Sequence, residues 1–413
     1  MTLKEKRRID QLRHGIVPEG YKRTKVGICP EDWVENVLGD IYTERKEPGN
    51  EGLPLLMVSI HSGVSDGEVG EKDLPKRFKR IEDKSQYKRA VVGDLVFNMM
   101  RAWQGAIGSV RTEGMVSPAY VVAKPNDMVD PLFMDYYMKT NRMVHTIHRQ
   151  SYGVTDFRLR LYWESFAPIP CALPPAREQK KIAEILTTQG KVIELEQQKI
   201  EEIIKVKRFF LEKMFPKKGK AVPEIRFKGF TDPWEQRKLG DTVQITMGQS
   251  PDGSTYSDVP SDYILVQGNA DLQNGWVFPR VWTSQMTKKA DVGDLIMSVR
   301  APAGAMGKTA YNAVIGRGVA AIKGNEFIYQ LLVKMDSDGY WKALSCGSTF
   351  ESLNSDNIKN ADMLIPDVSE QEKIGEYFAN LDRLITLHQR KLEEEKEKKK
   401  ALMQLLLTGI VRV

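Results

Sequence analysis

Residues 299–310, VRAPAGAMGKTA, end in the Gly-Lys-Thr of a phosphate-binding loop. The full pattern is G-x-x-x-x-G-K-[ST], in which backbone N–H groups hold phosphate and the lysine reaches its terminal groups. Pro302 stands where the first glycine belongs, and proline has no N–H to donate. The sequence therefore does not support a nucleotide triphosphate site, and we interpret these glycines as residues of a tight turn between strands.

Two other signals of enzyme chemistry are also incomplete. A DNA methyltransferase needs an Asn/Asp-Pro-Pro-aromatic loop, and the nearest string, DPLF at 130–133, has leucine in place of the second proline. We interpret DPLF as the start of a helix instead. His145 and His148 lie three residues apart without a carboxylate motif nearby, so we interpret them as surface or core histidines rather than metal ligands.

Length and composition predict a soluble protein of two or three domains, since 413 residues with 41% hydrophobic and 28% charged residues can bury more than one core. No apolar run reaches the ~18 residues of a membrane span, and the charged N-terminus lacks a signal-peptide core, so we expect a cytoplasmic location. The cysteines stand singly, which predicts small core residues rather than a disulfide framework or zinc site; they are Cys29, Cys171 and Cys346.

The net charge of +6 favours anionic partners. Positive charge is concentrated between residues 74 and 111, where nine cations oppose three carboxylates. These cations are Lys76, Arg77, Lys79, Arg80, Lys84, Lys88, Arg89, Arg101 and Arg111. The segment is a candidate phosphate-facing surface, with a solvated basic face as the alternative.

The chain repeats itself with a shift of about 200 residues, which suits a duplicated domain rather than a solenoid. Each half has Val-Pro-Glu, then Trp33 or Trp234, then Leu-Gly-Asp at the same distance. Val-Gly-Asp-Leu recurs next, followed by Arg-Ala and a glycine turn, and LPPAREQKKIAEIL at 173–186 matches IPDVSEQEKIGEYF at 365–378. The first-half counterpart of GAMGKTA is GAIGSVR, so both halves make this turn without needing the lysine.

A long amphipathic helix is expected after each Glu-Gln block, because apolar residues recur at spacings of 3, 4 and 7. The first stripe contains Ile182, Ile185, Leu186, Val192, Ile193, Ile200, Ile203, Phe210 and Met214. The second contains Ile374, Phe378, Leu381, Leu384, Ile385, Leu392, Leu402 and Leu406. Each helix would be ~57 Å long, and the two stripes could bury each other in a coiled coil with solvated charged flanks.

Between each tryptophan and the next long helix, the sequence predicts mainly short β-strands. Examples are the β-branched or aromatic runs at 88–100, 115–125, 262–270 and 290–300, which Gly, Pro, Asn and Asp interrupt. Short helices are expected at 131–150 and 326–337. The start of the chain, DQLRHGIV, also resembles QLLLTGIV near its end, as though one continued the other. Joining them would give the molecule a pseudo-twofold axis, which suits a pseudosymmetric ligand or two copies of one partner.

On these motifs and their order, the chain resembles the specificity subunit of Type I restriction-modification systems over nearly its whole length. MGQSPDG, LVQGNA and SVRAPAG are similar to one recurring class of recognition domain in that family. The resemblance implies a DNA-binding subunit without catalytic residues, in which each globule reads one half of a bipartite asymmetric target. It also implies that the helices set the gap and dock two modification subunits, and that two restriction subunits with translocase and nuclease activity can join.

The resemblance further implies that this subunit holds no cofactor, because S-adenosylmethionine, ATP and Mg would be bound by partners that methylate adenine at N6 and cleave DNA. The expected fold class is α+β, with two mainly β target recognition domains, two long helices packed as an antiparallel coiled coil and a pseudo-twofold repeat. The expected divisions are an N-terminal segment 1–28 beside the C-terminal helix, recognition domains 29–173 and 222–366, and helical spacers 174–221 and 367–413.

The repeat also sorts the candidate DNA contacts, since positions shared by both halves cannot distinguish two half-sites. Arg101 and Arg300 are therefore phosphate or fold-supporting candidates, whereas differing positions are candidates for base edges. The complete set of predicted contacts is Arg77, Lys79, Arg80, Arg101, Gln104, Arg111, Tyr152, Arg158, Arg160, Gln249, Ser250, Tyr256, Gln267, Asn269, Arg300, Lys308 and Arg317. Ser250 and Tyr256 could instead be turn and core residues.

A coiled-coil scaffold that binds only protein is the alternative function. It leaves unexplained why the globules diverge between halves while the helices stay similar. Salt-dependent binding to random DNA would separate the two, because a scaffold should show none.

Overall fold

The computed structural model describes residues 1–413 except 1–2, 61–62, 66, 68–80, 156–157 and 346–351. It contains two compact units, each described separately below. The first unit comprises Met1–Glu194 and Glu393–Val413, and the second comprises Leu195–Leu392.

The first unit contains mainly short strands and short helices before its long helices. Its helices are α1 (Leu3–Arg13), α2 (Leu38–Ile41), α3 (Pro131–Tyr137), α4 (Asn141–Gln150) and α5 (Trp163–Phe166), with 3-10 turns η2 (Lys84–Gln86) and η3 (Ala102–Gln104). Its strands are β1 (Tyr21–Thr24), β2 (Gly27–Pro30), β3 (Val34–Val37), β4 (Tyr42–Glu44), β5 (Val58–Ser59), β6 (Gly63–Val64), β7 (Lys88–Ala90), β8 (Leu95–Asn98), β9 (Ile107–Ser109), β10 (Gly114–Val116), β11 (Tyr120–Pro125) and β12 (Pro170–Leu173).

A four-stranded sheet in the order β4-β11-β8-β9 forms the centre of the first unit. Its core is closed by the beginning of one long helix and the end of the other, since Ile182 and Leu186 pack in the same cluster as Leu406 and Leu407. Helix α3 begins at Pro131 because the Asp130 carboxylate caps it, accepting a hydrogen bond from the backbone N–H of Phe133 at 2.8 Å.

The second unit repeats this plan with longer sheets. Its strands are β13 (Glu235–Lys238), β14 (Gln244–Met247), β15 (Tyr256–Ser257), β16 (Tyr263–Val266), β17 (Leu272–Gln273), β18 (Trp276–Val277), β19 (Val281–Thr283), β20 (Lys289–Ala290), β21 (Leu295–Ser298), β22 (Met306–Lys308), β23 (Ala313–Ile315), β24 (Val319–Lys323) and β25 (Asp362–Ile365). Its short helices are α7 (Leu239–Thr242), α8 (Glu326–Ser337), α9 (Tyr340–Ser345) and α10 (Ser355–Lys359), with 3-10 turns η5 (Gly253–Thr255) and η6 (Asn269–Asp271).

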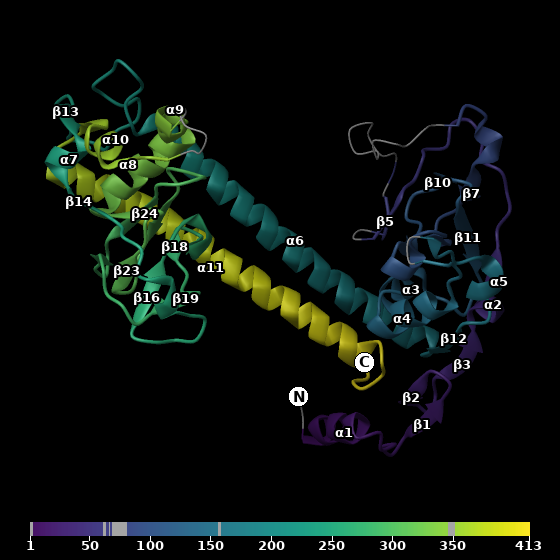
Figure 1. Cartoon of the computed structure of the whole chain (residues 1–413). Helices are drawn as coiled ribbons and strands as arrows, with labels where there is room; N and C mark the ends of the chain where they lie inside the picture. The colour runs from purple at the N-terminus through teal and green to yellow at the C-terminus, as the bar shows by residue number, and fades with distance from the viewer. Residues whose placement is uncertain (1–2, 61–62, 66, 68–80, 156–157, 346–351) are drawn as a thin grey trace. The chain divides into compact units, whose positions relative to one another are not determined.

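Two sheets make up the recognition region of the second unit. One has six strands in the order β14-β24-β21-β22-β18-β17, and the other has five in the order β15-β19-β16-β23-β20 (Figure 1). The core again includes both long helices, because Leu211 and Met214 pack in the same cluster as Ile374 and Phe378.

The repeated Val-Gly-Asp-Leu motif forms the same turn in both units. The Asp94 carboxylate accepts a hydrogen bond from the Val91 N–H at 2.8 Å, and the Asp294 carboxylate accepts one from the Asp291 N–H at 2.9 Å. The glycine before each aspartate has positive φ, 93° and 90°, which explains its residue type.

The two long helices are α6 (Ala176–Lys213) and α11 (Val368–Leu406). They run antiparallel in each unit: in the second unit Glu196 faces His388 at 2.8 Å and Lys207 faces Asp382 at 2.6 Å. The α+β class with two recognition regions and long helices is confirmed. The predicted strand runs and short helices also occur, since β7, β8, β11, β16, β21, α3, α4 and α8 lie within them and β10 and β20 begin one residue earlier.

Part of the predicted stripe is wrong. Leu384 is 43% exposed, whereas its neighbour Ile385 is partly buried. A single partner helix covers only a narrow seam, so two adjacent positions cannot both point into it. Cys29 and Cys171 are buried, as predicted for core residues, and Cys346 lies outside the described residues. Burial raises the pKa of the Cys171 thiol to about 12.

Candidate nucleic-acid interface

Parallel strands bring two of the predicted contact loops together in the second unit. Strands β16 and β23 pair in parallel with Val266 opposite Ile315, so the residues after them leave the same edge of the sheet. The N–H of Gly316 donates to the carbonyl of Val266 at 2.8 Å, which places Gln267 beside Arg317. The sequence separates these residues by 50 positions, and the sheet makes them neighbours.

A third loop joins this edge after β14. The N–H of Gln249 donates to the carbonyl of Ile315 at 2.8 Å, and the N–H of Arg317 donates to the Ser250 hydroxyl at 3.1 Å. A Cβ atom on Gly248 would lie 2.0 Å from the carbonyl oxygen of Gly316, so this close approach of the two loops requires glycine at position 248. The loops at 248–251, 267–269 and 316–318 therefore form one surface, called the three-loop surface below.

The predicted base-reading side chains of the second half lie on the three-loop surface. Gln249 and Arg317 are exposed, and Gln267 and Asn269 are partly exposed. Within the described part of the chain, these four side chains have no hydrogen-bond partner. Arginine can pair with guanine and glutamine or asparagine with adenine, so the surface carries the residue types that read base edges.

Asp271 holds one of the three loops, and the sequence prediction missed it. Its buried carboxylate accepts from the N–H groups of Gln267 at 2.7 Å and Gly268 at 3.2 Å, and it pairs with Arg280 at 2.8 Å. A carboxylate with three donors orients the loop without facing the ligand. The sequence GNADLQNG could have indicated this role, because the Asp271 side chain lies close in sequence to backbone N–H groups, and aspartate often accepts hydrogen bonds from such groups.

Ser250 and Tyr256 have local roles on this surface. The Ser250 hydroxyl accepts from the Arg317 N–H, and the Tyr256 hydroxyl donates to the carbonyl of Pro251 at 3.2 Å. Both contacts shape the 248–251 loop, and Tyr256 is half-buried.

In the first unit, five of the predicted contacts lie on two segments that a backbone hydrogen bond joins. Arg101 and Gln104 are exposed on the turn that contains η3, and the Leu161 N–H donates to the carbonyl of Met99 at 2.9 Å beside that turn. The second segment runs from Tyr152, 65% exposed, to Arg160, and these two residues exchange backbone hydrogen bonds at 2.8 and 2.9 Å. Arg158 is exposed on the same segment.

The second unit has an equivalent backbone hydrogen bond between two segments, but the residues beside it differ. The Leu353 N–H donates to the carbonyl of Val299 at 2.9 Å, and Arg300 forms a β-bridge with Ser352. Arg300 is exposed like Arg101. Lys308 is placed differently, because its ammonium pairs with Glu326 at 3.0 Å and lies 4.5 Å from the centre of the Tyr329 ring. That ammonium is held inside the unit.

In the basic segment of the first unit, some of the described cations have partners within the unit. Arg77, Lys79 and Arg80 lie outside the described residues. Of the others, the Lys88 ammonium donates to the carbonyl of Tyr120 at 2.7 Å, and Arg89 pairs with Glu113 at 2.7 Å. Burial lowers the pKa of Lys88. These two cations make contacts within the unit that composition does not reveal, and the phosphate-facing surface stays a prediction.

The comparisons with known proteins agree with this geometry. The family model described as Type I restriction modification DNA specificity domain matches residues 120–205 and 231–397, which is more than half of the chain. The chain belongs to this family. A putative type I restriction enzyme specificity subunit, MjaX, of Methanocaldococcus jannaschii is 28% identical, and the match covers 96% of this chain and 97% of that relative.

Solved structures show the same fold. A structure titled as a type I restriction-modification system S subunit from M. genitalium has a TM-score of 0.60 at 13% identity and covers 91% of this chain and 96% of its own. A chain from a study of complex assembly and conformational transition in the type I system has a TM-score of 0.56 at 21% identity, covering 93% of this chain and 99% of its own. The resemblance predicted from sequence is confirmed, and the protein is a specificity subunit.

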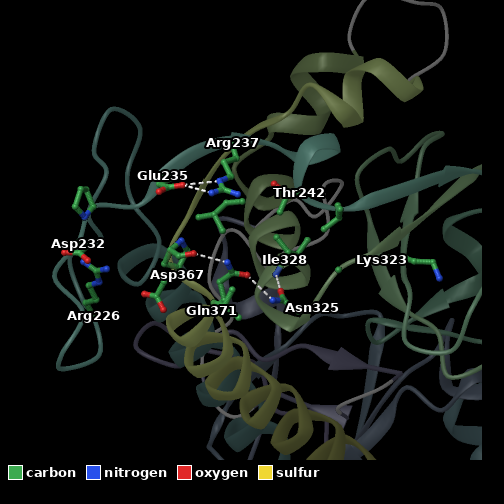
Figure 2. A pocket seen from close by; sticks show the side chains of 16 residues that line it. Arg226, Asp232, Glu235, Arg237, Thr242, Lys323, Asn325, Ile328, Asp367 and Gln371 are labelled. Atoms are coloured by element: carbon green, nitrogen blue, oxygen red, sulfur yellow. Dashed lines mark hydrogen bonds and ion pairs between the residues drawn. The ribbon is translucent and has the colours of Figure 1, made fainter.

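The Glu-Gln blocks of this specificity subunit anchor the long helices to the recognition regions. Gln179 accepts from the Asp130 N–H at 2.9 Å and donates to the carbonyl of Met128 at 2.8 Å. Gln371 accepts from the Asn325 amide at 3.0 Å, and Asn325 caps α8, as Figure 2 shows. Each glutamine thus connects a long helix to the cap of a shorter one.

The glutamates of the same blocks are clamped by arginines. Glu178 accepts from Arg412 at 2.6 Å, and Glu370 accepts from Arg226 at 2.7 and 2.8 Å. The Arg412 guanidinium also pairs with Asp32, and these two carboxylates raise its pKa. Arg412 comes from the end of the chain, whereas Arg226 comes from the segment after α6, so different parts of the sequence supply the same contact.

The cavity beside Arg226 has a volume of 570 Å³ (Figure 2). Of its charged lining residues, Arg237 pairs with Glu235 at 2.8 Å and Lys323 pairs with Asp291 at 2.8 Å. Among the described residues, no cluster of His, Cys, Asp or Glu is placed to hold a metal ion. His145 and His148 are exposed on α4. No described helix has the length and apolarity needed to cross a membrane.

Proposed function

We propose that each recognition region of this specificity subunit reads one half of a bipartite, asymmetric DNA target. The observation that carries the proposal is the contrast within the repeat: the turns and helix anchors recur in both units, whereas the exposed polar side chains on the neighbouring loops differ. A fixed frame with two different reading surfaces fits an asymmetric target.

The second half-site would be read by the three-loop surface, through Gln249, Gln267, Asn269 and Arg317. Their unpaired amide and guanidinium groups are suited to the acceptor and donor patterns of the major groove. The first half-site would be read by Gln104, Tyr152, Arg158 and Arg160. Arg101 and Arg300 recur in both halves and would contact phosphate, which positions the protein without carrying sequence information. Lys308 is left out because Glu326 already pairs with it.

The partners in this proposal are DNA and the other subunits of the system. Two modification subunits would dock on the helices and methylate adenine at N6 with S-adenosylmethionine, and two restriction subunits would bring ATP and Mg for translocation and cleavage. No cofactor is assigned to this chain, and the complex would work in the cytoplasm. Exposed apolar side chains on the second-unit parts of α6 and α11 support docking there; they are Leu195, Phe209, Leu384 and Leu387.

The test is to co-express the chain with its cognate modification subunit and map N6-methyladenine across the host genome by single-molecule sequencing. We expect methylation at one bipartite motif with a fixed gap. A stable complex that adds no methylation and shows no salt-dependent DNA binding would contradict the proposal and favour the scaffold alternative.

A further inference from the structure

A lysine and an aspartate of the two long helices pair in the second unit. The Lys207 ammonium, on α6, lies 2.6 Å from one oxygen of Asp382, on α11. The other oxygen of Asp382 accepts from the Gln330 amide at 2.8 Å, and Gln330 also donates to Glu326 at 2.9 Å. Glu326 in turn pairs with Lys308. Two cations are thus balanced by two carboxylates where the helices meet the recognition region.

The first unit keeps the lysine of this arrangement and lacks the acid. A shift of 192 residues superimposes the apolar stripes of the two helices, for example Ile182 on Ile374. The same shift takes Lys207 to Lys399 and Asp382 to Gly190. A Cβ atom on Gly190 would lie 3.1 Å from the Lys399 ammonium, so the two positions still face each other. The first unit therefore has no carboxylate at the position that Asp382 takes in the second, and this position is called the open place below.

Two more cations act on Lys399. Burial, and then the charges of Lys139 and Arg111, lower the pKa of Lys399. The Lys399 ammonium lies 5.4 Å from the centre of the Tyr136 ring. The acid paired in this group is Asp135, 3.4 Å from the Arg111 guanidinium, and it also accepts from the Ser109 N–H at 2.8 Å. Among the described residues, this basic cluster of three cations has one carboxylate partner.

We propose that a phosphate group of bound DNA fills the open place, held by Lys399, Lys139 and Arg111. The inference rests on the proposed DNA-binding function. A phosphodiester has one negative charge and two free oxygens, as the Asp382 carboxylate has. The Arg111 side chain is 55% exposed, so the cluster is accessible from solvent. The contact belongs to the first unit alone, because Asp382 already neutralises Lys207 in the second. It adds an affinity contact without base preference.

The test is Gly190→Asp, which supplies the missing carboxylate inside the protein. Aspartate is a better helix former than glycine, so the variant should fold at least as well as the natural chain. In the complex with modification subunits, we expect binding to a random duplex to weaken roughly five- to tenfold near ~0.1 M salt. The slope of log K against log salt should fall in magnitude by about 0.9, the loss of one phosphate contact.

The matched control is Thr188→Asp, which adds the same charge at an exposed position two residues away on α6. We expect it to leave the salt slope unchanged. Lys399→Met provides a second variant and should lower the slope as Gly190→Asp does. Equal slopes for Gly190→Asp and Thr188→Asp would overturn the proposal.

Two further measurements distinguish a DNA phosphate from other groups that could fill the open place. Weaker assembly of Gly190→Asp with the modification subunits in the absence of DNA would show that a partner's carboxylate fills the place, and would overturn the DNA contact. Stabilisation of the natural chain by inorganic phosphate, with an unchanged DNA slope in the variant, would identify a free-phosphate site instead. If the natural complex shows no salt-dependent DNA binding at all, the proposed function fails and this inference fails with it.

Discussion

At the residue scale, single buried carboxylates determine the shape of the exposed loops. Asp271 receives two backbone N–H groups and the Arg280 guanidinium, so it orders the 267–269 loop while remaining covered itself. The side chains expected to touch DNA depend on this group although it does not face solvent. Specificity can therefore be lost by changing a residue that never contacts a base.

Asp271→Asn should loosen this loop. The amide retains one acceptor oxygen and loses the charge, so we expect about 1–3 kcal/mol less stability and faster hydrogen exchange at Gln267 and Gly268. Methylation mapping should show relaxed reading of one half-site and unchanged reading of the other. Asp252→Asn, at an exposed turn whose carboxylate accepts from the Ser254 N–H, is the control. Unchanged exchange at Gln267 and Gly268 in Asp271→Asn would contradict this account.

Arg226→Met should destabilise the second unit strongly. Glu370 is fully buried and accepts two hydrogen bonds from Arg226, so removing the arginine leaves an unpaired buried charge. Breaking such a pair costs about 3–5 kcal/mol. Thermal and urea unfolding of Arg226→Met should show this loss of unfolding free energy.

The exposed pair of Arg237 and Glu235 is the control for that measurement, because both side chains are more than half exposed. Arg237→Met should cost at most about 0.5 kcal/mol. Adding Glu370→Gln to Arg226→Met should recover part of the loss. Similar losses of stability for Arg226→Met and Arg237→Met would mean that the buried pair of Arg226 and Glu370 stabilises the unit no more than the exposed pair does.

At the scale of elements, a polar cluster interrupts the apolar seam between α6 and α11. Glu196 accepts from His388 at 2.8 Å and Lys391 at 2.5 Å. Lys391 and then His388 lower the pKa of Glu196 below its ordinary value of 4.5. The facing helix α11 keeps the Glu196 carboxylate in its charged form. This contact helps to set the register of α6 against α11.

This cluster predicts a pH dependence of helix pairing. Because the pKa of Glu196 is lower in the folded chain, its contribution is present above 4.5 and is lost as the pH falls through the folded value. Urea unfolding followed by circular dichroism at about pH 7 and about pH 3.5 should therefore show a larger loss for the natural chain than for Glu196→Gln. Glu201→Gln, at an exposed position of α6, should behave like the natural chain. Equal acid sensitivity of Glu196→Gln and the natural chain would refute the assignment.

At the scale of the whole molecule, the two long helices belong to both recognition units. The start of α6 and the end of α11 complete the core of the first unit, and their opposite ends complete the core of the second. A change within the middle of the helices leaves both cores and both reading surfaces untouched. The gap between half-sites and the bases that are read should therefore be separable properties.

Removing seven residues around Glu196 together with seven around His388 should shorten the gap and leave the half-sites unchanged. Seven residues remove about 10.5 Å of helix, which corresponds to about three base pairs, and a heptad keeps the apolar seam in register. Methylation mapping of the variant complex would measure both properties. A changed base in either half-site with the gap intact would contradict the spacer role.

The sequence by itself was sufficient for the fold class, the repeat and the family. Periodicity of 3.6 residues and repeated local motifs are properties of neighbouring residues, and they predicted the long helices and the short helices α3, α4 and α8. The same local information separated the broken Gly-Lys-Thr pattern from a nucleotide site, because Pro302 lacks the required N–H.

Only the tertiary structure decided which charged and polar groups are free. Lys88 and Arg89 were candidates by composition and Lys308 was a predicted DNA contact, and the structure pairs them with Tyr120, Glu113 and Glu326. The three-loop surface and the open place at Gly190 depend on residues that are distant in sequence. Pairing of strands and helices sets those distances, and burial then determines which charges must be compensated.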